Sequence, residues 1–347
     1  MQPLLQIDGV TKSFQRRGGR FGMRVSQVHA VDNVSLMLRE GETLGLVGET
    51  GSGKSTLGRL VLRLVEPSAG RILLAGRDIT MLPRRAVRAL RRDVQMVFQD
   101  PYGSLDPRMS VGALIAEPMV VHGIAKAERR ERVQDIVHRV GLDRRHLDRY
   151  PHEFSGGQRQ RIGIARAMVV SPRLLVLDEP VSALDVSIQA QIINLLRRLQ
   201  RDQGLAYLFI AHDLAVVRHV SDRVAVMYLG RIVETGPRDA IYARPLHPYT
   251  VTLLSAVPLA DPVRERSRQR VMPRGEIGSA TAIPPGCRFH PRCYKALLAA
   301  AQGAARSSAD PTVPALCAEH DPPLIEAASN HLVACHFPEL AGAEPIA

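Results

Sequence analysis

The residues whose types and spacing could do chemistry begin at Gly48, where the sequence reads GETGSGKST. Glycines let the backbone curl so that successive N–H groups point at one anion. Lys54 can reach the β- and γ-phosphates of a nucleotide, and the hydroxyl of Ser55 can complete the shell of a Mg²⁺ ion. The sequence therefore predicts an ATP- and Mg²⁺-binding loop made of Gly48, Thr50, Gly51, Ser52, Gly53, Lys54, Ser55 and Thr56.

The elements around this loop must hold it in place. The apolar run 43–47 predicts a strand that enters the loop, and apolar spacing from Leu57 predicts a helix that stops at Glu66–Pro67. The start of that helix would add its partial positive charge to the anion site. A glycine-rich surface turn is the alternative, but the full G-x-x-x-x-G-K-S-T spacing between strand and helix disfavours it.

A second apolar strand, at 174–178, ends in Asp178 and is followed directly by Glu179. Asp178 can hold Mg²⁺ through water, and Glu179, placed beside the γ-phosphate, can orient and polarise the attacking water. A strand followed by acidic residues is common by itself. Together with the upstream loop, it predicts a site that hydrolyses ATP.

A second anion site is indicated at residues 155–158, which read SGGQ and precede a helix expected at 158–169. One ATP does not need two such sites on one protein. Here the chain resembles the nucleotide-binding subunit of an ATP-binding-cassette (ABC) transporter. The resemblance implies a head-to-tail dimer, in which this loop caps the γ-phosphate held by the partner's loop. The implied nucleotide contacts are Ser155, Gly156, Gly157 and Gln158.

The other motifs of that family follow in order, over roughly residues 4–260. The resemblance implies that Gln99 senses Mg²⁺ and faces the membrane subunits, and that His212 contacts the γ-phosphate. It also implies that the loop ending at Asp185 communicates between the two ATPases. The adenine-stacking aromatic is expected to be Phe14, with Phe21 and Tyr102 as alternatives.

Four stretches resemble the ATPases of oligopeptide and dipeptide permeases more specifically; they are residues 98–111, 244–258, 284–293 and 331–339. Such permeases usually have two different ATPases, and the chain is most similar to the second of them. This resemblance implies a subunit that powers import of peptides or related solutes, peripheral on the cytoplasmic face of the inner membrane. The implied partners are a second ABC ATPase, two transmembrane permease subunits and, through the complex, an extracytoplasmic solute-binding protein. The cargo is not encoded in these motifs. The alternatives are a soluble ABC ATPase acting on nucleic acid or ribosomes, an exporter ATPase, and a regulatory subunit that does not hydrolyse ATP.

All four cysteines lie near the C-terminus with the spacing C-x5-C-x23-C-x17-C; they are Cys287, Cys293, Cys317 and Cys335. Four thiolates suit a [4Fe–4S] cluster or Zn²⁺, and the resemblance favours the cluster. The family's gap between the second and third cysteines is shorter, so a loop at 296–311 is expected to absorb the excess. Unliganded thiols are the alternative, and His290, His320 and His336 could replace ligands of zinc.

The bulk composition fits this interpretation. The chain has 347 residues and a net charge of +12, but its arginines are spread along the sequence, so no nucleic-acid partner is expected. No apolar run is long enough to cross a membrane. The alternation of strands and helices predicts an α/β fold. The resemblance specifies a P-loop NTPase core of the ABC type, with a mixed sheet, flanking helices and an N-terminal antiparallel β subdomain. The expected divisions are a nucleotide-binding domain at 4–258, its helical subdomain at about 105–165, and a cysteine-containing extension at 259–347.

Overall fold

An eight-stranded sheet forms the centre of the computed structural model, which describes residues 2–18, 24–258, 261, 265–266, 270–275, 278–308 and 310–339. Along the sheet the strands are β11 (Ile325–Ala328), β12 (His331–Val333), β10 (Arg231–Pro237), β9 (Arg223–Tyr228), β3 (Thr43–Val47), β8 (Ala206–Ala211), β7 (Leu174–Asp178) and β6 (Val94–Val97). The strands from β9 to β6 pair in parallel, whereas β10, β12 and β11 pair antiparallel at one edge. The expected α/β fold with a mixed sheet is confirmed.

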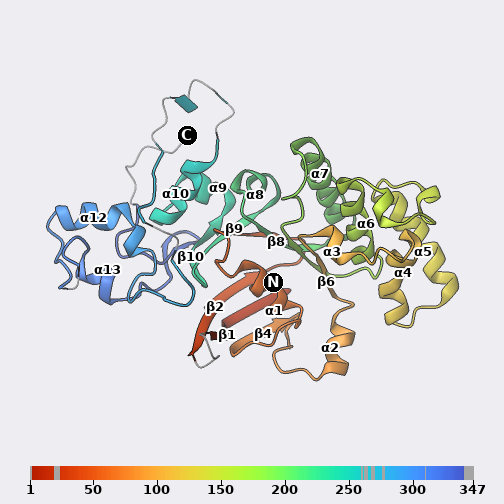
Figure 1. The fold of residues 1–347 in the computed structure, drawn as a ribbon, viewed down its shortest axis with the longest axis horizontal. Coiled ribbons are helices and arrows are strands. Elements are labelled where there is room, and N and C mark those ends of the chain that lie inside the picture. The colour runs from red at the N-terminus through yellow and green to blue at the C-terminus, as the bar shows by residue number, and fades with distance from the viewer. Residues whose placement is uncertain are drawn as a thin grey trace.

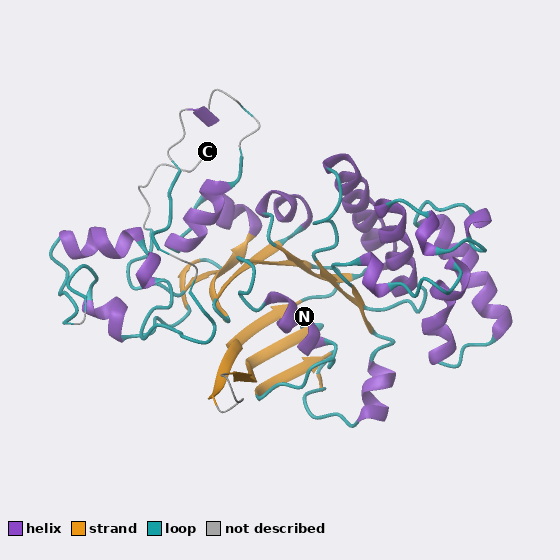
Figure 2. Cartoon of the chain, in the orientation of Figure 1, coloured by secondary structure: helices purple, strands orange, loops and turns teal. Residues whose placement is uncertain are grey.

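Both faces of this sheet are buried, because successive side chains of a strand point to opposite sides. On β8, Leu208 and Ile210 pack with helix α1 (Lys54–Val61) and the N-terminal strands. Tyr207 and Phe209 belong to the other core, with helices α6 (Gly156–Met168), α7 (Val186–Gln203) and α8 (Leu214–Val220). The central sheet is thereby held between two packed layers (Figure 2).

The N-terminal sheet is antiparallel, in the order β2-β1-β4-β5; its strands are β1 (Leu5–Gly18), β2 (Arg24–Leu38), β4 (Ala69–Leu74) and β5 (Arg77–Asp78) (Figure 1). The basic stretch 16–24 does not form the expected loop throughout. Strands β1 and β2 extend into it, with Arg16 opposite Ser26 and Gly18 opposite Arg24. Pairing in a hairpin satisfies the hydrogen bonds of the backbone N–H and C=O groups whatever the side chains are. The basic, polar composition of this stretch therefore wrongly indicated a loop.

The helical subdomain lies at one side of the sheet, where Figure 1 shows α4, α5 and α6 together. It consists of α3 (Pro101–Ser104), α4 (Val111–Val121), α5 (Lys126–Arg139), two short 3₁₀ turns at Arg144–His146 and Pro151–Glu153, and α6. Helix α2 (Arg84–Leu90) precedes it. Buried Leu114, Ile115 and Met119 of α4 pack into the same core as α6.

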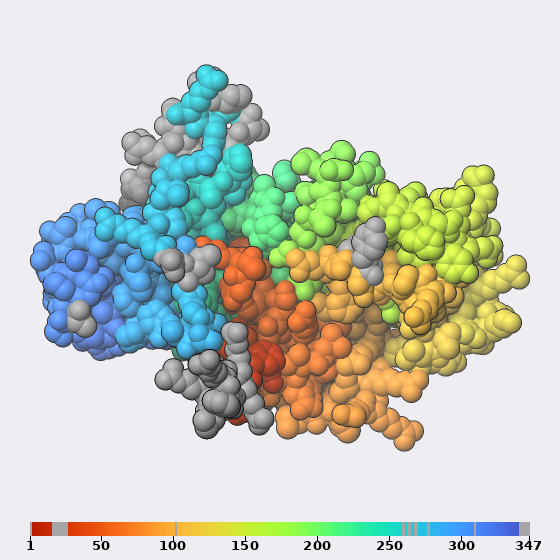
Figure 3. All heavy atoms as spheres, viewed as in Figure 1, coloured from red at the N-terminus to blue at the C-terminus, as the bar shows by residue number. Residues whose placement is uncertain are grey.

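The C-terminal residues form a lobe at the opposite end (blue in Figure 3) and also complete the sheet through β11 and β12. Helices α9 (Arg238–Ala243) and α10 (Pro248–Ala256) come before this lobe, whose own helices are the 3₁₀ turn η3 (His290–Arg292), α12 (Tyr294–Ala301) and α13 (Ala315–Glu319). Much of the alanine-rich stretch is helix α12, and not the loop expected there. Alanine favours helix, and Ala296 and Ala300, one turn apart, are both buried.

Candidate active site at the carboxyl ends of the parallel strands

The glycine loop connects β3 to α1 as expected. Gly48, Gly51 and Gly53 all have positive φ, at 153°, 82° and 108°. A Cβ on Gly48 would come within 2.1 Å of the Met227 carbonyl oxygen, and one on Gly53 within 2.0 Å of the Ala30 carbonyl oxygen. Neighbouring strands therefore press on this loop, and only glycine fits at these two positions. Such a cradle suits a phosphate chain.

Lys54 opens helix α1, and its side chain is buried within the loop. Its ammonium donates to the Gly48 carbonyl at 2.7 Å, to the Glu49 carbonyl at 2.9 Å and to the Ser52 hydroxyl at 3.3 Å. Burial lowers the pKa of Lys54, while the nearby carboxylates oppose that shift. An anionic phosphate at this loop would favour the charged ammonium further.

A site for a hard cation lies beside Lys54. The Ser55 hydroxyl donates to the Asp178 carboxylate at 2.8 Å, which brings oxygen donors from helix α1 and strand β7 together. Burial raises the pKa of Asp178, although the Ser55 hydrogen bond and Arg59 oppose the shift. A hydroxyl and a carboxylate are ligands that Mg²⁺ prefers, so these residues fit Mg²⁺ bound with a nucleotide.

Glu179, Gln99 and His212 meet although they come from three different strand ends. The Gln99 amide donates to Glu179 Oε2 at 2.9 Å, and His212 Nδ1 lies 3.2 Å from the same oxygen. Glu179 has φ of 47°, an uncommon conformation for a residue with a side chain. Strain of this kind clusters at functional sites. The arrangement gives one carboxylate a hydrogen-bond donor, an imidazole neighbour and a fixed direction, as a group that orients water requires.

The SGGQ segment lies at the start of helix α6, to one side of the glycine loop (Figure 1). The Ser155 hydroxyl accepts from Gln158 N at 3.4 Å, and the Gln158 side chain accepts from Ser155 N at 3.1 Å. A Cβ on Gly157 would come within 2.5 Å of Ile188, so this turn packs tightly on helix α7. At the start of α7, the Asp185 side chain makes no capping hydrogen bond.

The candidate adenine-stacking residue Phe14 is 39% exposed on β1, with the Lys12 ammonium 5.0 Å from its ring centroid. An exposed aromatic next to a cation can stack on a base. Phe21 lies outside the described residues, as does the side chain of Tyr102. The choice of Phe14 stays a prediction.

The four cysteines line one small cavity in the C-terminal lobe, together with His290 and His336. Burial, reinforced by the neighbouring thiols, raises the pKa of Cys293 to about 11 and that of Cys317 to about 12. The cavity volume is only about 10 Å³, room for one water. Across the described residues, no group of three or more His, Cys, Asp or Glu is placed to hold a metal ion. The donor chemistry fits a metal, but the expected [4Fe–4S] cluster is not supported, because the described residues form no metal-binding group and their cavity has no room for four irons.

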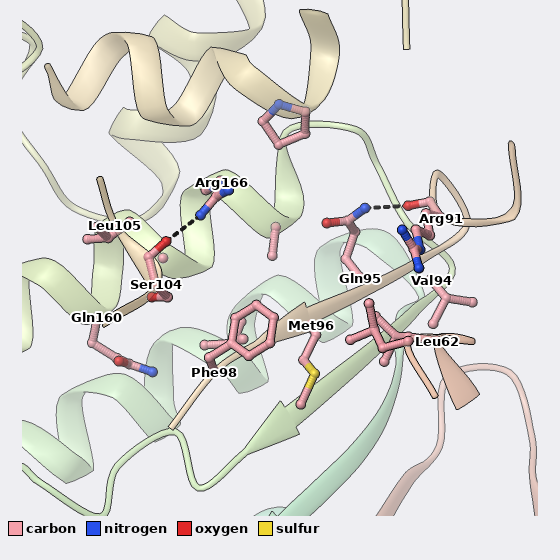
Figure 4. Close-up of a pocket in the computed structure, with 15 residues that line it drawn as sticks. Leu62, Arg91, Val94, Gln95, Met96, Phe98, Ser104, Leu105, Gln160 and Arg166 are labelled. Atoms are coloured by element: carbon pink, nitrogen blue, oxygen red, sulfur yellow. Dashed lines mark hydrogen bonds between the residues drawn. The ribbon is translucent and has the colours of Figure 1, made fainter. Parts of the chain in front are cut away.

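A mostly apolar groove of about 140 Å³ separates strand β6 from the helical subdomain (Figure 4). Phe98 and Leu64 line it and are 41% and 43% exposed. Arg166 borders it and donates to the Ser104 carbonyl at 2.6 Å. The buried Gln160 Nε2, also at the groove, has no hydrogen-bond partner among the described residues. Gln99 directly follows Phe98, so the groove adjoins the Glu179 cluster.

Two residues of this site were not anticipated from the sequence. Tyr249, in α10, accepts a hydrogen bond from Glu49 N at 2.8 Å, and Arg292 pairs with the Glu49 carboxylate. The available signal was Glu49 itself, because an acidic side chain inside an anion-binding loop needs a cationic partner. Nothing in the sequence indicated which cation that would be.

Comparison with known proteins identifies the family to which this site belongs. Residues 31–182 match the ABC transporter family, and residues 233–298 match the C-terminal region of oligopeptide/dipeptide transporters. The chain is 48% identical to the oligopeptide transport ATP-binding protein AppF of Bacillus subtilis (strain 168), over 97% of this chain and 98% of that protein. It is 55% identical to the glutathione import ATP-binding protein GsiA of Salmonella typhi, over 80% of this chain but 45% of GsiA.

Solved structures agree in fold. The cbiO1 protein from Clostridium perfringens superposes with a TM-score of 0.61 at 29% identity, over 70% of this chain and 91% of that one. The ATP-binding cassette MJ0796 bound to ADP and Pi, a dimer in a post-hydrolysis state, gives 0.59 at 26% identity, over 67% and 98%. None of these relatives supports the nucleic-acid alternative. This chain belongs to the ABC transporter ATP-binding proteins of the oligopeptide/dipeptide branch, and it is an ATPase.

Proposed function

We propose that Glu179 orients the water that attacks the γ-phosphate of ATP. The observation that carries this role is the convergence of Gln99 and His212 on its carboxylate, beside the Ser55–Asp178 pair. Glu179 would accept the proton of the attacking water, and His212 would steady the γ-phosphate. Lys54 and the loop N–H groups would bind the phosphates, and Mg²⁺ held at Ser55 and Asp178 would offset their charge.

We infer a head-to-tail dimer, which the position of the SGGQ turn supports. Within one chain this turn starts α6 in the helical subdomain, to one side of the glycine loop (Figure 1). A second ABC ATPase would supply Ser155, Gly156, Gly157 and Gln158 to the nucleotide, and Asp185 would lie at the dimer interface. The dimeric cassette among the similar structures supports this arrangement.

The chain would use this ATP to import peptides or related solutes; AppF is named for oligopeptide transport and GsiA for glutathione import. Its partners would be two membrane permease subunits and, through them, an extracytoplasmic solute-binding protein. Within the described residues no helix is both long and apolar enough to cross a bilayer. We place the subunit peripherally, on the cytoplasmic face of the inner membrane, with residues 4–258 as its nucleotide-binding domain and 259–347 as its extension.

The groove between β6 and the helical subdomain is the docking site that we assign to a short helix of a permease subunit. Phe98 and Leu64 supply exposed apolar contacts to that helix. A helix seated here would contact the segment that carries Gln99, so its movement would be coupled to hydrolysis.

Affinity purification from detergent-solubilised membranes tests this function. Wild type should recover two polytopic membrane proteins and a second ATPase, and Leu64→Glu should lose them while still binding ATP. Leu298→Glu is the matched control, because Leu298 is 54% exposed on α12, outside the groove. Recovery of soluble proteins or RNA alone would refute the proposed partners. Equal loss of the membrane proteins in Leu64→Glu and Leu298→Glu would refute the docking site.

The four cysteines are proposed to bind a metal centre, zinc or a [4Fe–4S] cluster, although the described residues are not placed to hold one. All four cysteines line one cavity, which supports the donor set, but a cluster would need more room than that cavity offers. Iron, sulfide and zinc contents of protein purified without oxygen distinguish the cases. Loss of the metal in Cys293→Ser would identify the site, and a metal-free wild type would refute it.

A further inference from the structure

The carboxylate of Glu49 stands inside a loop that binds anions, and its partner comes from the C-terminal lobe. Arg292 Nη1 donates to Glu49 Oε2 at 2.8 Å, and Nη2 donates to Oε1 at 3.1 Å. This is the two-pronged geometry in which a guanidinium holds a carboxylate in both position and orientation. A lysine could not make both bonds.

The pair is enclosed by aromatic side chains. Arg292 is 6% exposed, and its guanidinium carbon lies 5.9 Å from the ring centroids of both Tyr228 and Phe289. Those two rings and that of Tyr249 pack on one another, with centroids 4.7 to 5.3 Å apart. Burial alone would lower the pKa of Arg292, but its bonds to Glu49 and Tyr228 outweigh burial and raise it. The guanidinium is therefore packed among aromatic rings, while the Glu49 side chain stays 21% exposed.

The backbone of Glu49 carries this restraint into the phosphate-binding loop. Its carbonyl accepts from Lys54 Nζ at 2.9 Å and from Ser52 N at 3.2 Å. Its N–H donates to the Tyr249 hydroxyl at 2.8 Å. A shift of Glu49 would therefore move the acceptor of Lys54 and the first turn of the loop together.

We propose that Arg292 is a positioning residue of the ATP site, which acts through Glu49 to hold the first turn of the phosphate-binding loop. The C-terminal lobe would thus be part of the nucleotide site, although Arg292 touches no nucleotide. Cys293 directly follows Arg292 in the sequence. One of the four cysteines is therefore a single peptide bond away from the residue that holds Glu49. The inference depends on ATP binding and not on which solute is carried.

A double-mutant cycle on the full chain tests the route through Glu49. Mg-ATP affinity is measured by calorimetry for wild type, Arg292→Gln, Glu49→Gln and the double variant. Arg292→Gln should raise the Kd about tenfold, the loss expected for one charge-assisted hydrogen bond. In the Glu49→Gln background the same change should alter the Kd by less than about twofold. Lys295→Gln is the control, since Lys295 pairs with Glu339 in the same lobe.

Two further readouts separate positioning from general stability and from charge. With Arg292→Gln, KM for ATP should rise while kcat at saturating ATP stays within about twofold, and Arg292→Lys should recover part of the affinity. Glu49→Gln should weaken ATP binding although it removes a negative charge near the phosphates.

Three results would overturn the proposal: an unchanged Kd in Arg292→Gln, an equal loss with and without Glu49, or tighter binding in Glu49→Gln. If Arg292→Gln gives little folded protein, Arg292→Lys replaces it in the cycle, because lysine keeps the charge but loses the paired geometry. Failure of peptide import with this cycle intact would refute the proposed transport function alone.

Discussion

Replacement of Glu234 by alanine should destabilise the protein more than replacement of any exposed acid. Glu234 lies on β10 with no exposed surface and accepts three hydrogen bonds. Leu246 N donates at 2.7 Å, His247 N at 2.9 Å, and His331 Nε2 lies 2.7 Å away. The carboxylate therefore joins the central sheet, the start of α10 and the last strand, β12.

The magnitude follows from the groups that Glu234→Ala would leave without a partner. Two buried N–H groups and one buried imidazole would each lose an acceptor, at about 1–3 kcal/mol apiece. Such losses are not additive, so we expect the free energy of unfolding to fall by about 3–5 kcal/mol, as for other broken buried pairs. Urea denaturation followed by circular dichroism measures this change.

Glu131→Ala is the matched control, because Glu131 is exposed on α5 and should cost less than about 0.5 kcal/mol. Glu234→Gln should be intermediate, since an amide can accept only through its single oxygen. A loss below about 1 kcal/mol in Glu234→Ala would refute the reasoning, because those three donors would then have found other partners.

Three more predictions follow from the active site and the core. Glu179→Gln should lower kcat by about 10²–10⁴-fold with ATP affinity retained, and retained turnover would exclude it as the base. Gly48→Ala, whose Cβ would lie 2.1 Å from a carbonyl oxygen, should lower the melting temperature more than Gly51→Ala, which has open space; equal shifts would show that the loop can move away. Burial lowers the pKa of His247 from 6.5 to about 3, so the unfolded chain takes up a proton that the native state excludes. The free energy of unfolding should therefore fall as pH drops from 6.5 towards 3, by at most about 1.4 kcal/mol per pH unit. The fall should be steeper than in His247→Asn, whose side chain can still accept from Tyr249 N but does not titrate. Parallel stability–pH profiles of the two proteins would contradict this.

The ATP site could be predicted because its residues follow local rules. The glycine loop, Lys54 and Ser55 occur within one strand–loop–helix unit, and Asp178 and Glu179 end a plainly apolar strand. Parallel strands bring their carboxyl ends to one edge, which is why Gln99 and His212, far apart in sequence, meet at Glu179. Pattern and topology together were sufficient for this part.

The parts that were missed depend on pairings between distant segments with no local signature. Arg292 and Glu49 are 243 residues apart, and arginine is common throughout the chain. Helix α12 replaced an expected loop because burial of Ala296 and Ala300, with Ala296 packed against Val313 and Cys317, and not composition alone, decided its conformation. The edge strands β11 and β12 are short, and exposed side chains line β11, so neither gave a clear alternating pattern.

The pairing of β12 with β10 has a consequence for the time course of synthesis. Glu234 on β10 leaves the ribosome almost one hundred residues before His331, since the two are 97 positions apart. At about 5–20 residues per second, several seconds pass with that edge of the sheet unpaired and its carboxylate without its histidine. The nascent chain would then carry an open strand edge, which is prone to pair with other chains. Chaperone occupancy during translation should therefore end only after residue 333 has emerged.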